Sequence, residues 1–193
     1  MEAFLISTIA ITLGEIGDKT QLLALILAAR FKKPVPIILG ILCATLLNHA
    51  LAGFVGHFIG NQIPHDILRW VMGIFFIIMA FWTLKPDEMD EDEQPKTSPY
   101  GVFMTTCIAF FLAEMGDKTQ VVTIGLAAQF QALFWVIAGT TLGMLIADIP
   151  AVILGKIASP KFPFKLVRYC AAAIFAVLGL LALFGPYIGL DVS

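Results

Sequence analysis

The chain has 193 residues, of which 59% are hydrophobic and 13% are charged, and its formal net charge is -2. A soluble domain carries about 45–50% apolar and about 25% charged residues, so this composition excludes an ordinary water-soluble fold. The sequence has no basic stripe, which excludes nucleic acid as an expected partner. It therefore predicts an all-α protein whose surroundings are a lipid bilayer.

Six apolar stretches are long enough to cross a bilayer, which takes about 20 residues in a helix. The first stretch contains Glu15 and Asp18, so we expect a retained helix and not a cleaved signal peptide. These features predict a polytopic membrane protein with six transmembrane helices. In chain order the stretches are 3–29, 34–59, 67–84, 100–128, 132–155 and 166–188.

The sequence repeats itself at an offset of 99 residues. At this offset the heptapeptide Glu-Ile-Gly-Asp-Lys-Thr-Gln at 15–21 lies over Glu-Met-Gly-Asp-Lys-Thr-Gln at 114–120. Each copy holds three predicted spans, and because three is odd, the second copy enters the membrane from the opposite face, as in many secondary transporters. We expect repeat 1 at 1–84, an acidic cytoplasmic linker at 85–99 and repeat 2 at 100–193.

Lysine and arginine residues gather on one side of the predicted spans, and the other side has Arg69 alone. The positive-inside rule places the basic side in the cytoplasm, so both termini are expected outside it. The basic side carries Arg30, Lys32, Lys33, Lys85, Lys96, Lys156, Lys161, Lys165 and Arg168.

Each repeat opens with an apolar stretch that carries charges near its middle, where one charge costs at least about 2.5–3.5 kcal/mol. On a continuous helix Glu15, Asp18 and Lys19 share one face. A glycine inside the charged cluster, Gly17 in the first copy and Gly116 in the second, permits a kink or a short unwound turn. Unwound backbone at this depth is tolerated where it lines a cavity or is buried in protein.

Bringing the two motifs together predicts a metal site made of Glu15, Asp18, Glu114 and Asp117. With the two motif lysines ionised, the net charge of the pair is -2, which a divalent cation neutralises. Carboxylate, carbonyl and hydroxyl oxygens suit Ca²⁺, Mn²⁺ or Mg²⁺. The expected supporting residues are Lys19, Thr20, Gln21, Lys118, Thr119 and Gln120.

Two alternatives concern individual residues. In one, Glu15 pairs with Lys19 inside its own helix and Glu114 pairs with Lys118 in the same way, while the aspartates cap a kink, so that the charges are only structural. The other concerns the second helix of each repeat, where Asn48-His49 is equivalent to Ala147-Asp148. Asp148 is expected to be a further ligand or a proton acceptor, whereas His49 either packs or handles protons. Small residues spaced four apart, as at Gly139 and Gly143, predict close helix packing.

The doubled Glu-x-Gly-Asp-Lys-Thr motif resembles the signature of uncharacterised protein family 0016. That family includes Golgi Ca²⁺/Mn²⁺:proton exchangers and bacterial manganese exporters. The resemblance implies that Glu15, Asp18, Glu114 and Asp117 bind the cation, and it favours Mn²⁺ over Ca²⁺. It also implies a multi-pass protein of a bacterial inner membrane.

The expected function is export of a divalent cation in exchange for protons by alternating access, with no cofactor. A passive cation channel has the same ligands, and an intramembrane acid/base enzyme is the remaining alternative. The sequence leaves the oligomeric state open.

Overall fold

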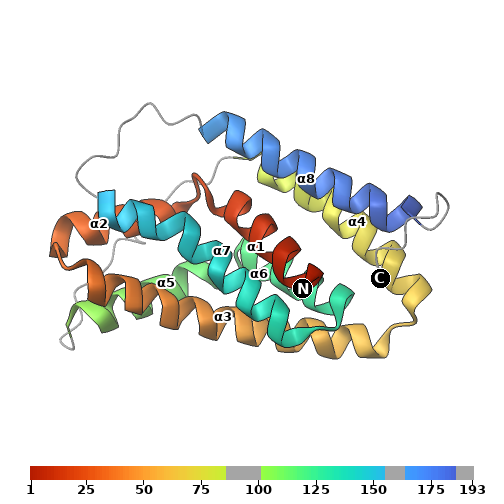
Figure 1. Ribbon diagram of the computed structural model, residues 1–193, viewed down its shortest axis with the longest axis horizontal. Helices are drawn as coiled ribbons and strands as arrows, with labels where there is room; N and C mark the ends of the chain where they lie inside the picture. The colour runs from red at the N-terminus through yellow and green to blue at the C-terminus, as the bar shows by residue number, and fades with distance from the viewer. Residues whose placement is uncertain (86–100, 155–163, 186–193) are drawn as a thin grey trace.

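The computed structural model describes residues 1–85, 101–154 and 164–185, which form α-helices alone. Apart from Lys85, the predicted acidic linker lies outside these residues. The first copy of the repeat contains α1 (Glu2–Glu15), α2 (Lys19–Phe31), α3 (Pro34–Gln62) and α4 (His65–Thr83). The second contains α5 (Val102–Glu114), α6 (Lys118–Phe130), α7 (Leu133–Leu154) and α8 (Phe164–Phe184) (Figure 1).

The stretches predicted as single helices at 3–29 and 100–128 are each two helices. The helix α1 ends at Glu15 and α5 ends at Glu114, and the next helix begins four residues later in both copies, at Lys19 and at Lys118. Gly17 has φ 84° and Gly116 has φ 78°, a left-handed conformation that glycine adopts without steric penalty. The unwound turn predicted at these glycines is therefore confirmed, and the continuous helical face expected for the motif is wrong.

The outer surface is apolar and the interior carries charge. Phe54, Phe58 and Phe81 are 62%, 67% and 72% exposed, whereas Glu15 and Glu114 are fully buried. This distribution is the reverse of that in a soluble protein, so the chain is a membrane protein. Within the described part, the helices long and apolar enough to cross a membrane are Pro34–Gln62, Asp66–Thr83 and Leu133–Ile153, and shorter apolar helices are Val102–Glu114 and Tyr169–Phe184.

The two copies pack into each other. The helix α1 lies along α7, and α3 lies along α5 and α6, while α4 and α8 lie side by side (Figure 1). A Cβ atom at Gly139 of α7 would lie 2.5 Å from the carbonyl oxygen of Phe4 in α1. At the equivalent position of the first copy, a Cβ at Gly40 would lie 2.8 Å from the carbonyl oxygen of Phe103 in α5. The predicted close packing at Gly139 is confirmed, and the contacts between copies are reciprocal.

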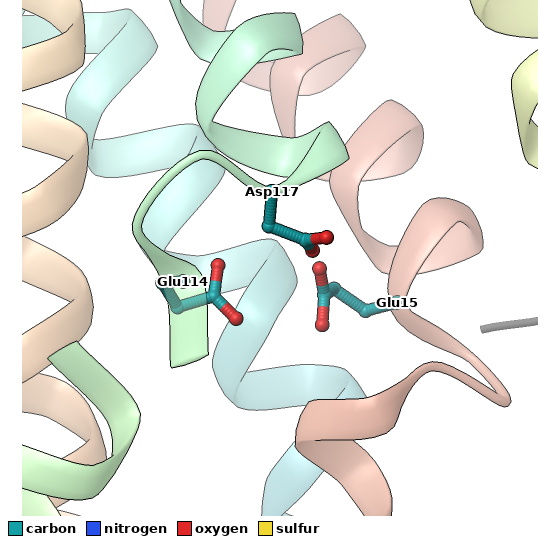
Figure 2. Close-up of side chains that lie close together, drawn as sticks. All are labelled: Glu15, Glu114 and Asp117. Carbon is teal, nitrogen blue, oxygen red and sulfur yellow. The ribbon is translucent and has the colours of Figure 1, made fainter. Parts of the chain in front are cut away.

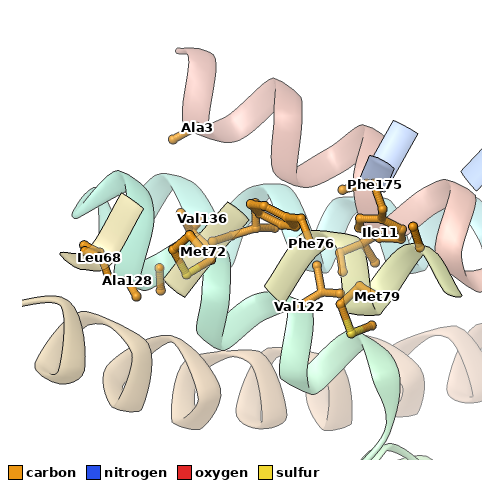
Figure 3. Close-up of a cluster of buried hydrophobic side chains, with 14 of the residues drawn as sticks. Ala3, Ile11, Leu68, Met72, Phe76, Met79, Val122, Ala128, Val136 and Phe175 are labelled. Carbon is orange, nitrogen blue, oxygen red and sulfur yellow. The ribbon is translucent and has the colours of Figure 1, made fainter. Parts of the chain in front are cut away.

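Two clusters of buried hydrophobic side chains hold the helices on either side of each break. One cluster includes Ile11 of α1, Phe76 of α4 and Val122 of α6 (Figure 3). The other includes Leu27 of α2 and Phe110 of α5. Each broken helix thus has one half in each cluster. Because hydrophobic packing fixes both halves, the polar turn between them is held at a defined place.

Candidate metal centre

The two breaks have the same backbone geometry. After α1 the chain passes through Ile16 at φ -65° and ψ 114°, and Asp18 then begins α2 from an extended conformation at φ -84° and ψ 168°. In the second copy, Met115 has φ -65° and ψ 117°, and Asp117 has φ -80° and ψ 167°. The two motifs, which differ only at Ile16 and Met115, therefore have nearly the same backbone, with the glycine supplying the left-handed step between two extended residues.

A glutamine side chain closes each turn. The backbone N–H of Gly17 donates a hydrogen bond to Oε1 of Gln21 at 3.0 Å, and that of Gly116 donates to Oε1 of Gln120 at 2.8 Å. These bonds satisfy amide groups that the interrupted helix leaves without an intrahelical acceptor. The structure thus gives both glutamines a role in shaping the turn.

The two motif glutamates point into the interior, and a threonine holds each of them. Oγ1 of Thr20 donates to Oε2 of Glu15 at 2.6 Å, and Oγ1 of Thr119 donates to Oε2 of Glu114 at 2.8 Å. Among the described residues, the second oxygen of each glutamate, Oε1, has no hydrogen-bond partner. A buried polar atom of this kind calls for an explanation, and a bound cation supplies one.

Three of the four predicted carboxylates meet. One oxygen from each of Glu15, Glu114 and Asp117 lies within 4.8 Å of the others (Figure 2). Oxygen ligands lie about 2.0–2.6 Å from Mg²⁺ or Ca²⁺, so ligands of one ion are separated by at most about 5 Å. The three carboxylates are therefore spaced for a single divalent cation.

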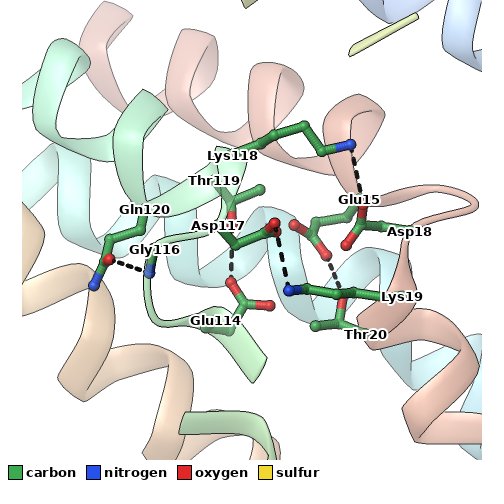
Figure 4. A network of polar contacts seen from close by, with 10 residues as sticks. All are labelled: Glu15, Asp18, Lys19, Thr20, Glu114, Gly116, Asp117, Lys118, Thr119 and Gln120. Carbon is green, nitrogen blue, oxygen red and sulfur yellow. Dashed lines mark hydrogen bonds and ion pairs between the residues drawn. The ribbon is translucent and has the colours of Figure 1, made fainter. Parts of the chain in front are cut away.

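The fourth carboxylate, Asp18, is engaged by a lysine of the other copy. Nζ of Lys118 lies 3.1 Å from Oδ1 of Asp18, and Nζ of Lys19 lies 3.7 Å from Oδ1 of Asp117 (Figure 4). The alternative in which each lysine pairs with the glutamate of its own helix is wrong. That alternative assumed the four-residue spacing of a continuous helix, and the break between the glutamate and the lysine removes this geometry.

Of the residues predicted on the second helix of each repeat, Asn48 has a structural contact, whereas His49 and Asp148 are buried without one among the described residues. Nδ2 of Asn48 donates to the carbonyl oxygen of Phe111 at 3.1 Å and ties α3 to α5. Asp148 and His49 are both fully buried, and none of their side-chain oxygen or nitrogen atoms has a hydrogen-bond partner among the described residues. The residue before Asp148, Ala147, accepts a hydrogen bond from Gln21, so Asp148 lies next to the point where α7 contacts the first motif.

Sequence reasoning missed one backbone group that ties the first motif to α7. Nε2 of Gln21 donates to the carbonyl oxygen of Ala147 at 3.0 Å, so the residue before Asp148 is joined to the first motif. Every residue has a carbonyl group, and the sequence therefore contains no signal for which one accepts such a bond.

An all-helical membrane protein whose broken helices bring carboxylates together at its centre has the design of a membrane transport protein for ions. A profile of the family described as "Divalent cation/proton antiporter GDT1" matches residues 3–91 and 102–189. The chain belongs to this family, which confirms the resemblance seen in the doubled motif.

Similar proteins match over nearly their whole length. The "Putative manganese exporter" of Vibrio cholerae is 48% identical over 185 residues, which cover 95% of this chain and 92% of the relative. The "GDT1-like protein sll0615" of Synechocystis sp. is 29% identical over 91% of this chain and 93% of the relative. The "Divalent cation/proton antiporter GDT1" of Saccharomyces cerevisiae is 22% identical over 97% of this chain and 85% of the relative. No solved structure matches the chain.

Proposed function

We propose that the chain exports a divalent cation from the cytoplasm in exchange for protons, with Mn²⁺ as the first substrate and Ca²⁺ as the second. The observation that carries the proposal is the meeting of Glu15, Glu114 and Asp117 within 4.8 Å in the protein interior. Hard oxygen donors of this kind suit Mn²⁺ and Ca²⁺. The names of the Vibrio cholerae and Saccharomyces cerevisiae relatives support export of manganese and exchange against protons.

Proton coupling follows from competition for the same oxygens. A carboxylate binds either a proton or the metal, so protons entering from outside displace the cation, and binding of the cation releases protons. Asp148 is the proposed additional proton acceptor, because it is fully buried, follows the residue that is hydrogen-bonded to the first motif, and lies outside the group of three ligands. The affinity for Mn²⁺ is therefore expected to rise with pH.

For the architecture, we propose two inverted repeats of three spans each, at 1–84 and 100–193, joined by the acidic linker at 85–99. The reciprocal contacts of Gly40 and Gly139 support a pseudo-twofold relation, and the matching breaks support a centre at the repeat interface. Both termini lie outside the cytoplasm and the protein resides in the bacterial inner membrane. Rocking of one repeat against the other then exposes the centre to each side in turn.

The test is flux in proteoliposomes with an imposed pH gradient. Mn²⁺, Ca²⁺ and Mg²⁺ are offered separately while the internal pH is followed. We expect uphill Mn²⁺ movement that dissipates the gradient, and we expect Glu15→Gln and Glu114→Gln to abolish it. The matched control is Glu2→Gln, because Glu2 lies on the same helix as Glu15 but is exposed.

Two results would replace this proposal. Flux that runs only downhill and ignores pH would make the protein a passive channel. Absence of flux from the wild-type protein would reopen the intramembrane enzyme. Exchange retained in both glutamine variants would remove Glu15 and Glu114 from the transport site.

A further inference from the structure

The two motifs share one backbone geometry but use their aspartates differently. At Asp18 and Asp117 the φ angles are -84° and -80°, and the ψ angles are 168° and 167°. Asp117 nevertheless joins Glu15 and Glu114 in the group of three ligands, and Asp18 does not. The asymmetry of the centre therefore lies in the side chains and not in the fold of the motifs.

The two lysine pairs show the same asymmetry. The pair between Lys118 and Asp18 has an N–O distance of 3.1 Å, and its side chains are 8% and 1% exposed. The pair between Lys19 and Asp117 has a distance of 3.7 Å, with side chains that are 18% and 8% exposed. The shorter and more deeply buried pair is thus on the aspartate that is outside the ligand group.

A lysine ammonium is a compact positive charge, so it can neutralise a carboxylate as a metal ion does. In this structure Lys118 does so for Asp18, while Lys19 is farther from Asp117. An aspartate in a low-dielectric interior needs such a partner whenever the cation is elsewhere. Each lysine reaches across to the other copy, so its contact depends on how the two copies are placed relative to each other.

The opposite arrangement can be built from the same parts. It keeps Glu15 and Glu114, replaces Asp117 by Asp18 as the third ligand, and closes Lys19 on Asp117. The charged residues of the two motifs and their backbone angles are equivalent, and Gly40 and Gly139 make reciprocal contacts, so this arrangement uses the same kinds of ion pair and ligand. In transporters with inverted repeats, exchange of the conformations of the two repeats turns the site from one side of the membrane to the other.

We propose that Asp18 and Asp117 alternate as the third carboxylate ligand of the divalent cation, and that Lys118 and Lys19 hold whichever aspartate is not in use. The described structure is the Asp117 arrangement, and the Asp18 arrangement faces the other side of the membrane. The lysines are positioning residues that compete with the cation. This proposal rests on the proposed function, because it assigns the two sides of one transport cycle.

The test is binding of Mn²⁺ from each face of the membrane, using the full chain in right-side-out and inside-out vesicles. Asp117→Asn is expected to weaken binding from one face by about tenfold or more, and Asp18→Asn from the opposite face, each leaving the other face within about twofold. Glu15→Gln is expected to weaken binding from both faces. Equal losses of Mn²⁺ affinity from both faces in the two asparagine variants would overturn the proposal and make all four acids one permanent site.

Failure of the proposed function would look different, because wild-type flux would then be absent or Glu15→Gln would have no effect.

Lysine variants separate competition from a merely structural ion pair. Lys118→Met keeps an unbranched apolar stem and removes the charge. If Lys118 competes with the cation for Asp18, this variant strengthens Mn²⁺ binding by about tenfold on the face that Asp18→Asn weakens, and Lys19→Met does so on the other face. Lys118→Arg keeps the charge and should bind as the wild type does. Weaker binding from both faces in Lys118→Met would show that the pair only holds the fold, and would overturn the competing role.

Discussion

Replacing Thr20 by valine removes the hydroxyl group that holds Glu15 while keeping the shape of the side chain. This hydroxyl donates a 2.6 Å hydrogen bond to a fully buried carboxylate. A hydrogen bond to a charged group contributes about 1.5–3 kcal/mol, and each 1.4 kcal/mol is a factor of ten in an equilibrium constant. We therefore expect Thr20→Val to weaken Mn²⁺ binding by roughly 10- to 150-fold, close to the 10- to 100-fold typical for partners of metal ligands. Thr119→Val should have a similar effect on Glu114, because its bond of 2.8 Å is equivalent.

The assay is titration calorimetry with Mn²⁺ on purified protein at fixed pH, with flux in proteoliposomes as a second readout. Thr123→Val is the matched control, because Thr123 is equally buried on α6 but donates to the carbonyl oxygen of Thr119 at 2.8 Å. Thr20→Ser keeps the hydroxyl group and should recover most of the affinity. If Thr20→Val and Thr119→Val bound Mn²⁺ as tightly as Thr123→Val, the glutamates would not be ligands oriented by these threonines.

Three further predictions concern the scaffold. A Cβ at Gly56 would lie 2.1 Å from the carbonyl oxygen of Ile124, so Gly56→Ala should destabilise the protein by about 1–3 kcal/mol and lower its unfolding temperature in detergent. The control is Gly14→Ala, which should leave the unfolding temperature unchanged because no atom lies within 4 Å of its Cβ. An equal fall in unfolding temperature for both variants would refute the close-packing argument. In Gly116→Ala the new Cβ meets no neighbouring atom, but alanine at a φ of 78° should destabilise the protein by about 1–2 kcal/mol and weaken Mn²⁺ binding. Unchanged thermal unfolding and unchanged binding would show that the left-handed turn is dispensable. Deletion of 87–93 should leave the dependence of flux on cation concentration unchanged if the acidic linker is a tether, whereas a shifted half-saturation would make it a sensor.

The local sequence pattern was sufficient to predict the unwound backbone turn at the site. Gly17 and Gly116 lie inside a charged cluster within an apolar stretch, and a residue without Cβ is what the left-handed step requires. The repeat offset of 99 residues also places the same glycine in both motifs, which predicts the same backbone turn in each. The structure confirms both inferences, because the two turns have nearly the same angles.

The pairing of charges could not be predicted in the same way. The rule that relates Glu15 to Lys19 assumes an unbroken helix, and the turn that the glycine permits removes that assumption. Which partner Lys19 finds instead depends on how α1 and α2 pack against helices of the second copy. That arrangement results from side-chain fit over many positions, and a pattern within one motif contains no record of it. The same reason applies to the backbone carbonyl of Ala147, which becomes an acceptor only through the position of α7.

The crossed ion pairs also bear on how the protein is made. When residues 1–85 have been synthesised, Lys19 and Asp18 are already within an apolar part of the chain, but their ion-pair partners Asp117 and Lys118 have not yet been translated. A chain that stops early keeps these charges in lipid without the partners that the second copy supplies, at a penalty of several kcal/mol for each ion. Synthesis and packing of α5 and α6 therefore supply the charges that neutralise the first motif. We therefore expect a product that is truncated before the second motif to be less stable in the membrane than the full chain, because its motif charges lack their crossed partners.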